Sequence, residues 1–160
     1  RHVVGIGEYA VSDHAGDVIV THALGSCVAV CLHDRTAGVS ALIHVLLPEA
    51  SINPARAAQQ PAAFADTGIP LLVQTAERMG LVRRRALVKL IGGAEITTVS
   101  GNGVMNIGRR NVIASKSLLW KLGLLITAEA VGGNLARTVH LAVGTGVVQV
   151  TNGGKPIVEV

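Results

Sequence analysis

The chain contains few aromatic residues, with one Trp, one Tyr and one Phe among 160 positions. Proteins that bind single-stranded nucleic acid stack the bases on aromatic side chains, and this supply is too small for such a platform. The densest basic cluster, Arg83–Arg85, follows a predicted helix end, where cations complement the helix dipole. Although the formal net charge is +4, we therefore expect no nucleic-acid partner.

Cysteine is also scarce, since only Cys27 and Cys31 are present. Two cysteines four positions apart form no disulfide framework and lack the paired spacing of a zinc site. The six histidines are scattered along the chain and form no compact ligand motif such as HExxH. We therefore expect free thiols, a reducing cytoplasmic setting, no metal and no cofactor.

Long apolar runs are missing as well. Hydrophobic residues make up 49% of the chain and charged residues 15%. No uninterrupted apolar stretch reaches the roughly 18 residues of a membrane span, which argues against membrane insertion. A chain of this length can bury a sizeable core, and no repeat or linker divides it. We expect one soluble domain over residues 1–160.

The apolar pattern predicts an α+β fold, with mostly antiparallel strands and two main helices. The predicted strands cover residues 3–6, 18–21, 28–32, 40–47, 86–91, 124–128, 138–142 and 147–150. The helices are predicted over 67–79 and 109–122, each ending at a glycine, with Pro70 in the opening turn of the first. Segment 48–63 has three prolines and no clean period, so we expect a long loop there.

Cys27 is the strongest candidate for chemistry, because it ends a Leu-Gly-Ser-Cys turn just before an apolar strand. If 28–32 and 40–47 pair as an antiparallel hairpin, paired positions sum to about 71, which puts Cys27 opposite His44. An imidazole there could take the thiol proton and later protonate a leaving group. A register slip of one residue would instead put the two side chains on opposite faces.

The turn before the strand adds to this hypothesis. The backbone N–H groups of Gly25, Ser26 and Cys27 could face a developing oxyanion. The turn and the base also predict that Cys27 is more exposed and more acidic than Cys31, which we interpret as a core residue. The alternative is that Cys27 is itself a small buried hydrophobe, as free cysteines commonly are.

Six segments, in their order and spacing, resemble the CheD family of chemoreceptor glutamine deamidases over nearly the whole chain. They are 4–9 (VGIGEY), 24–28 (LGSCV), 43–48 (IHVLLP), 91–94 (IGGA), 105–111 (MNIGRRN) and 131–134 (VGGN). The resemblance implies a catalytic Cys27–His44 dyad with Thr21 as the third residue, since a hydroxyl can orient an imidazole. It also implies a layered α/β/β arrangement, similar to the catalytic domains of deamidating bacterial toxins.

The resemblance further implies an activity and partners. The substrates would be glutamines on the cytoplasmic helices of methyl-accepting chemotaxis receptors, converted to glutamate, and the phosphatase CheC would be a second partner. In the family the glycine clusters lie around the substrate cleft, so Gly92, Gly93 and Asn106 are candidate cleft residues. The ordinary interpretation of such glycines is a turn that needs positive φ.

The chain departs from the family pattern at three places. His22-Ala23 replaces the Leu-Gly that commonly precedes the Leu-Gly-Ser-Cys turn, and the lost glycine is expected to stiffen that turn. Ala130 stands where an acidic residue often precedes the glycine pair. Thr97-Thr98 lacks the bulky side chain that many members present to CheC, which predicts weak CheC binding.

Two other functions stay open. The chain could be a Cys–His hydrolase of a small amide or methyl ester, with receptor methylesterase activity as the nearest version. It could also be a non-catalytic regulator that binds CheC or a receptor. A dinucleotide site is rejected, because the GxGxxA match at 5–10 is followed by polar residues where a helix should run.

Overall fold

The computed structural model describes residues 1–96, 106–155 and 157–160, which form two sheets and three α-helices. The central sheet contains, in spatial order, β2 (Tyr9–Ser12), β5 (Val39–Val45), β4 (Val28–Asp34), β6 (Leu87–Gly92) and β7 (Ile126–Val131). The outer sheet contains β1 (His2–Val3), β3 (Val18–Leu24), β8 (Arg137–Ala142), β9 (Val148–Asn152) and β10 (Val158–Glu159). The helices are α1 (Pro54–Gln59), α2 (Ala65–Arg78) and α3 (Ile107–Lys121).

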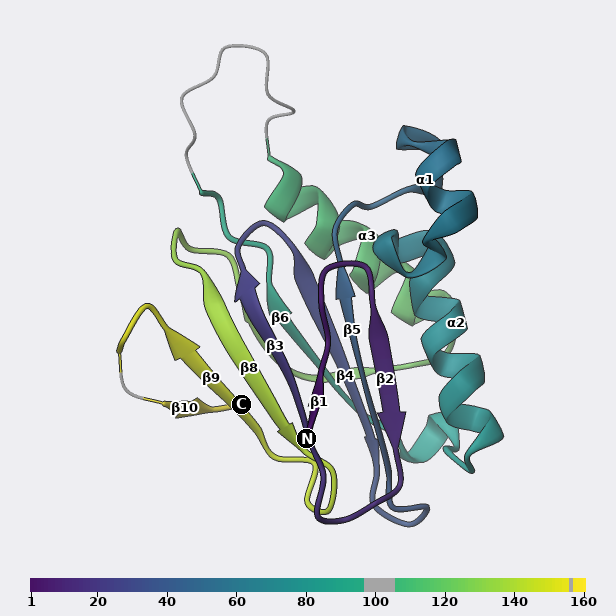
Figure 1. The fold of residues 1–160 in the computed structure, drawn as a ribbon. Coiled ribbons are helices and arrows are strands. Elements are labelled where there is room, and N and C mark those ends of the chain that lie inside the picture. The colour runs from purple at the N-terminus through teal and green to yellow at the C-terminus, as the bar shows by residue number, and fades with distance from the viewer. Residues whose placement is uncertain (97–105, 156) are drawn as a thin grey trace.

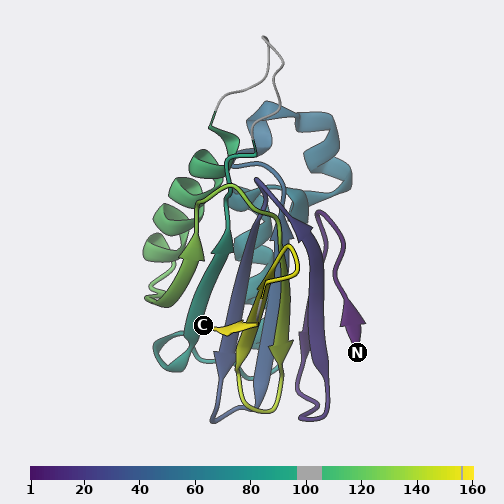
Figure 2. The same ribbon diagram turned by 90° about the vertical axis from the view of Figure 1, so that its left-hand side faces the viewer.

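These elements form three layers (Figures 1 and 2). The helices cover one face of the central sheet, and the outer sheet covers the other. Within the described residues all strand pairings are antiparallel except those of β1 with β3 and β6 with β7. The predicted α+β class and the predominance of antiparallel strands are confirmed.

Strand β4 shows how the sequence produces the layers. Its side chains alternate, so Val28, Val30 and Leu32 pack against the helices. The side chains of Cys27, Ala29 and Cys31 pack toward the outer sheet. All residues of β4 are buried because both faces of this central strand are covered, which explains its continuous apolar run.

The predicted long loop over 48–63 is wrong. This segment contains helix α1, which was not predicted, and a 3-10 turn on either side of it. Pro54 occupies the first turn of α1, where a missing N–H costs nothing, and the side chain of Asn53 accepts a hydrogen bond from the Arg56 N–H. Pro54 and Pro61 therefore begin helical turns here and do not prevent them. Helix α2 also begins two residues earlier than predicted, which puts Pro70 inside the helix and not in its opening turn.

Two strands are missing from the sequence prediction. Strand β2 pairs antiparallel with β5, and the two-residue β10 pairs with β9. Strand β2, and not a helix, follows the glycines of the GxGxxA match, so the prediction that no helix runs there is confirmed. None of the helices in the described ranges is long and apolar enough to span a bilayer. Thr97 and Thr98, which carry the prediction on CheC, lie outside the described residues.

Candidate active site

The predicted residues Thr21, Cys27 and His44 come together at one end of the space between the two sheets. Thr21 belongs to β3 of the outer sheet, His44 to β5 of the central sheet, and Cys27 immediately precedes β4. All three are buried, with 0%, 5% and 0% of their surfaces exposed. One thiol, one imidazole and one hydroxyl therefore lie toward the end of the sandwich where β3 leads into β4. Figure 1 shows the course of these strands.

The predicted hairpin register is wrong by two residues. In the β4–β5 ladder Ala29 pairs with His44 and Val28 with Val45, so Cys27 lies diagonally from His44 and not directly opposite. A shift of two keeps the parity of the strand, and Cys27 and Ala29 both face the outer sheet. The prediction that the thiol and the imidazole share a face is therefore confirmed.

Thr21 fixes the tautomer of His44. The Thr21 hydroxyl donates its single hydrogen to the Val4 carbonyl at 2.7 Å, and its oxygen lies 2.7 Å from His44 Nδ1. Because that hydrogen is already used, the Nδ1–H of His44 must donate to Thr21 Oγ1. The other ring nitrogen, Nε2, then carries a lone pair, and it has no hydrogen-bond partner among the described residues. His44 is thus set as a base through Nε2.

The backbone of His44 is held as well. The loop before β2 donates from the Gly7 N–H to the His44 carbonyl at 2.8 Å, and the His44 N–H donates to the Glu8 carbonyl at 3.0 Å. The same loop supplies the Val4 carbonyl that Thr21 uses. Residues 4–8 therefore hold both the main chain and the ring of the base.

Burial keeps both the Cys27 thiol and the His44 imidazole neutral. Removal from water raises the pKa of the Cys27 thiol to about 11 and lowers the pKa of the His44 imidazole to about 4. Cys27 is more exposed than Cys31, 5% against 2%, and its pKa is raised less, so the predicted order of the two thiols is confirmed, although the outer sheet covers both. Burial also raises the pKa of Cys31, to about 12, and this residue is in the core as predicted. Chemistry here begins from a thiol and a neutral imidazole.

The turn before Cys27 is held through its carbonyl groups. The carbonyl of Gly25 accepts from the Ala94 N–H at 2.9 Å, and that of Cys27 accepts from the Gly93 N–H at 2.8 Å. The Gly25 N–H donates to the Ala23 carbonyl, so it is not free for an oxyanion as predicted. The N–H groups of Ser26 and Cys27 donate to no backbone carbonyl within the described part of the chain.

The three candidate cleft residues lie around this turn in different ways. Gly92 and Gly93 are buried, and each has a positive φ, 111° and 64°. A Cβ on Gly92 would overlap the Cys27 carbonyl oxygen, so this glycine allows the strand to lie directly against the turn. Asn106 is exposed at the start of α3 with φ 64°. Whether these residues line a substrate cleft stays a prediction.

Asn111 is a residue of this site that the sequence prediction missed. Its side chain, on α3, is fully buried and donates from Nδ2 to the carbonyls of Ser26 and Leu46, both at 2.9 Å. The signal was present, because Asn111 ends the MNIGRRN segment. The position of Asn111 on a helix could not reveal that one of its hydrogen-bond partners, Ser26, belongs to a turn 85 positions earlier.

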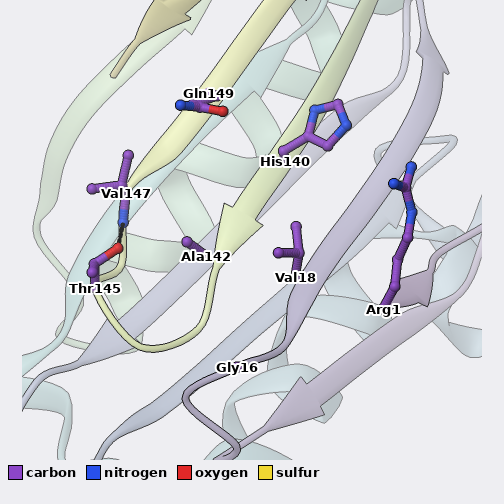
Figure 3. Close-up of a pocket in the computed structure, with 8 residues that line it drawn as sticks. All are labelled: Arg1, Gly16, Val18, His140, Ala142, Thr145, Val147 and Gln149. Atoms are coloured by element: carbon purple, nitrogen blue, oxygen red, sulfur yellow. Dashed lines mark hydrogen bonds between the residues drawn. The ribbon is translucent and has the colours of Figure 1, made fainter.

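A hollow of about 480 Å³ lies elsewhere, on the solvent face of the outer sheet (Figure 3). Its polar lining comes from Arg1, His140, Thr145 and Gln149. Neighbouring residues of β8, Val139 and Leu141, face the core between the sheets. The hollow is therefore on the opposite face of the outer sheet from Thr21 and His44.

Ala23 is strained, which gives a first prediction. It has φ 55° in a β-bulge between Thr21 and Leu24, a conformation that favours glycine. Left-handed alanine costs ~1–2 kcal/mol, partly offset by the larger unfolded-state entropy of glycine, so Ala23→Gly should stabilise the fold by ~0.5–1 kcal/mol. Urea unfolding measures this. Ala10→Gly, within β2, is the control and should destabilise; equal losses in both variants would contradict the strain.

The buried base gives a second prediction, on pH. Because the folded pKa of His44 is about 4 and the ordinary value 6.5, the unfolded chain binds a proton first as pH falls. Stability should therefore fall from pH 6.5 toward pH 4, by about 3 kcal/mol in total from this group. Guanidinium unfolding at pH 7.5 and 4.5 should show a smaller loss for His44→Gln than for the native chain. His14→Gln, at an exposed position, is the control, and an unchanged loss in His44→Gln would overturn the assignment.

The fold and the site define a three-layer α+β protein that buries a thiol, an imidazole and a hydroxyl between its sheets. The sequence model of the CheD family, described as CheD chemotactic sensory transduction, matches residues 46–152. The chain belongs to the CheD family. Thr21, Cys27 and His44 precede the matched range, but the alignments with full-length relatives cover almost the whole chain.

Relatives from bacteria and archaea support the same family. A protein of Syntrophotalea carbinolica, named probable chemoreceptor glutamine deamidase CheD, is 46% identical over 96% of this chain and 94% of its own length. The chemoreceptor glutamine deamidase CheD of Thermotoga maritima is 42% identical over 98% and 96%. The probable deamidase of Thermococcus kodakarensis is 42% identical over 94% and 93%. The names of these relatives describe an amide hydrolase that acts on chemoreceptors.

Proposed function

We propose that this protein is a protein-glutamine deamidase that converts specific glutamines of methyl-accepting chemotaxis receptors to glutamate. The names of the relatives support the reaction and the substrate class. The observation that carries the chemistry is the chain of hydrogen bonds from His44 through Thr21 to the Val4 carbonyl. It presents a lone pair on Nε2 on the face of the sheet that also carries Cys27.

The proposed reaction begins with proton transfer from the Cys27 thiol to His44 Nε2 while the sulfur attacks the side-chain amide carbon of the glutamine. The amide oxygen becomes an oxyanion, which accepts hydrogen bonds from the N–H groups of Ser26 and Cys27. His44 then returns the proton to the departing nitrogen, which leaves as ammonia, and a thioester remains. Attack by water, deprotonated by His44, releases glutamate and restores the thiol.

Thr21 is assigned a positioning role in this mechanism. Its oxygen accepts the Nδ1–H of His44 and would support the imidazolium that forms during each proton transfer, the part that a carboxylate or amide plays in other triads. A hydroxyl carries no charge, so its loss should weaken catalysis less than the loss of His44. We also propose that the layered arrangement is related to that of the catalytic domains of deamidating bacterial toxins.

Because the thiol and the imidazole are almost fully covered, the receptor must open the site as it binds. The proposed substrates are glutamines on the cytoplasmic helices of the receptors, which places the protein in the cytoplasm. CheC remains a proposed second partner of low affinity.

Two other activities remain candidates. The same thiol and base could attack a methyl ester, which would make the protein a receptor methylesterase. The buried, neutral dyad would also suit an inert protein that regulates CheC or a receptor by binding alone. No specific contact in the described residues favours either alternative over deamidation.

One experiment distinguishes these functions. The purified protein is incubated with a receptor signalling domain that is methylated in part, and the receptor is mapped by mass spectrometry. An amide-to-acid mass gain at particular glutamines, absent with Cys27→Ala, supports the deamidase. Loss of methyl groups would support the esterase, and tight binding with neither change would support the regulator.

A further inference from the structure

The turn before Cys27 is tied down by three donors, one for each successive carbonyl. Backbone N–H groups supply two of them, from Ala94 to the Gly25 carbonyl and from Gly93 to the Cys27 carbonyl. The third is the side-chain amide of Asn111, which donates to the Ser26 carbonyl. Asn111 is therefore the one side chain that holds a carbonyl of this turn among the described residues.

Holding the Ser26 carbonyl also orients the N–H that follows it. In a planar trans peptide the carbonyl and the next N–H point in opposite directions. Because the Ser26 carbonyl points at Asn111, the N–H of Cys27 points away from α3, and no backbone carbonyl in the described part of the chain accepts it. The same amide thus determines where a potential oxyanion donor is directed.

Asn111 also holds the facing strand apart from the turn. The β4–β5 ladder ends at the pair Val28–Val45, and the carbonyl of Leu46, the residue that follows β5, accepts a hydrogen bond from Asn111. Both hydrogens of Asn111 Nδ2 are used, one for the Ser26 carbonyl and one for the Leu46 carbonyl. These two acceptors fix the orientation of the amide. Without this amide two buried carbonyls would lose their donors, and the strands could pair further, drawing Cys27 into the ladder.

We infer that Asn111 is a positioning residue for the oxyanion site, acting through the Ser26–Cys27 peptide and not through the thiol or the base. The inference rests on the proposed thiol chemistry but not on glutamine being the substrate. It predicts that Asn111 affects every reaction of Cys27 that forms a tetrahedral oxyanion. Reactions of Cys27 without such an intermediate should be unaffected.

The test is a graded series at one position, Asn111→Ser with one donor and Asn111→Ala with none. Loss of a direct oxyanion donor costs about 10²–10³ in kcat, so misdirecting one should lower kcat for receptor deamidation by about tenfold to a hundredfold in Asn111→Ala. Asn111→Ser should be intermediate, and KM should change little. Ser115→Ala, one turn along the same buried face of α3, is the matched control and should match the native chain.

Two small probes make the result independent of the receptor. Acylation of Cys27 by p-nitrophenyl acetate forms an oxyanion and should slow in the same graded order. Alkylation of Cys27 by iodoacetamide forms none and should stay within about twofold of the native rate. Circular dichroism at the assay temperature, with rates corrected for the folded fraction, shows that the variants are folded.

The outcomes separate the two claims. Unchanged acylation in folded Asn111→Ala overturns the inference, and so does an equal fall in acylation and alkylation, which would mean that Asn111 supports the thiol or base directly. If acylation slows in the graded order from the native chain through Asn111→Ser to Asn111→Ala, but the native chain deamidates no receptor glutamine, the proposed function fails and the inference stands.

Discussion

Cys27→Ala is expected to reduce receptor deamidation by at least about a thousandfold, because it removes the only atom proposed to bond to the substrate. His44→Ala should cause a loss of similar size, since the thiol is neutral in the folded protein and needs a base at the moment of attack. The two residues act as one unit, so the double variant should be little worse than either single variant. Rates are measured by mass spectrometry of the receptor.

Cys31→Ala is the matched control for this prediction. Cys31 is a second buried cysteine on the same face of β4, and its replacement should lower stability but keep most of the deamidation. Thr21→Ala should lie between the control and the dyad variants, because it removes a hydrogen bond to Nδ1 and not a reacting group. Retention of most of the activity in His44→Ala, or additive losses in the double variant, would contradict the dyad.

Gly92→Ala is expected to have the largest effect on stability. The new Cβ would overlap the Cys27 carbonyl oxygen and lie 2.9 Å from Leu24 Cδ2, while Gly92 has φ 111°. Neither contact can relax easily, because the Cys27 carbonyl is held by the Gly93 N–H. We expect a loss of at least about 3 kcal/mol in the free energy of unfolding, from overpacking and backbone strain together. Denaturant unfolding measures it.

Gly132→Ala separates strain from overlap. Gly132 has φ 79°, and a Cβ there would meet no atom within 4 Å. Its replacement should cost only the ~1–2 kcal/mol of a left-handed alanine. If the two variants lost the same stability, close packing of β6 against the turn before Cys27 would not be the reason for a glycine at position 92.

Much of the site could be predicted from local sequence. The alternation of β4 puts Cys27 on the same face as His44 after any even shift of register, so their common face could be predicted although their direct pairing was wrong. Thr21 lies within β3 and has the same inward parity as Ile19. Its role came from the resemblance, and the hydrogen bond to His44 shows that the position suits that role.

Other features depended on contacts between distant segments. The burial of Cys27 comes from the outer sheet, whose residues Val139 and Leu141 are more than a hundred positions away along the chain. Local sequence does not show which residues from distant strands pack over Cys27, and it therefore suggested an exposed, acidic thiol. Helix α1 was missed for a different reason. A segment rich in proline can contain prolines that begin helices or prolines that end them, and its composition does not distinguish the two cases.

By itself the sequence determined the α+β class, the inward faces of the strands and the thiol–imidazole pair, because periodicity and parity are properties of a strand or helix alone. Only the tertiary structure decided the register, the tautomer of His44, the neutral state of both groups and the contacts of Asn111. Each of these depends on a donor, a carbonyl or an apolar cover from another element: Val4 for the tautomer, the outer sheet for the pKa values, and α3 for the turn. Hydrogen bonds and burial between elements are set by their relative position, which no single segment specifies.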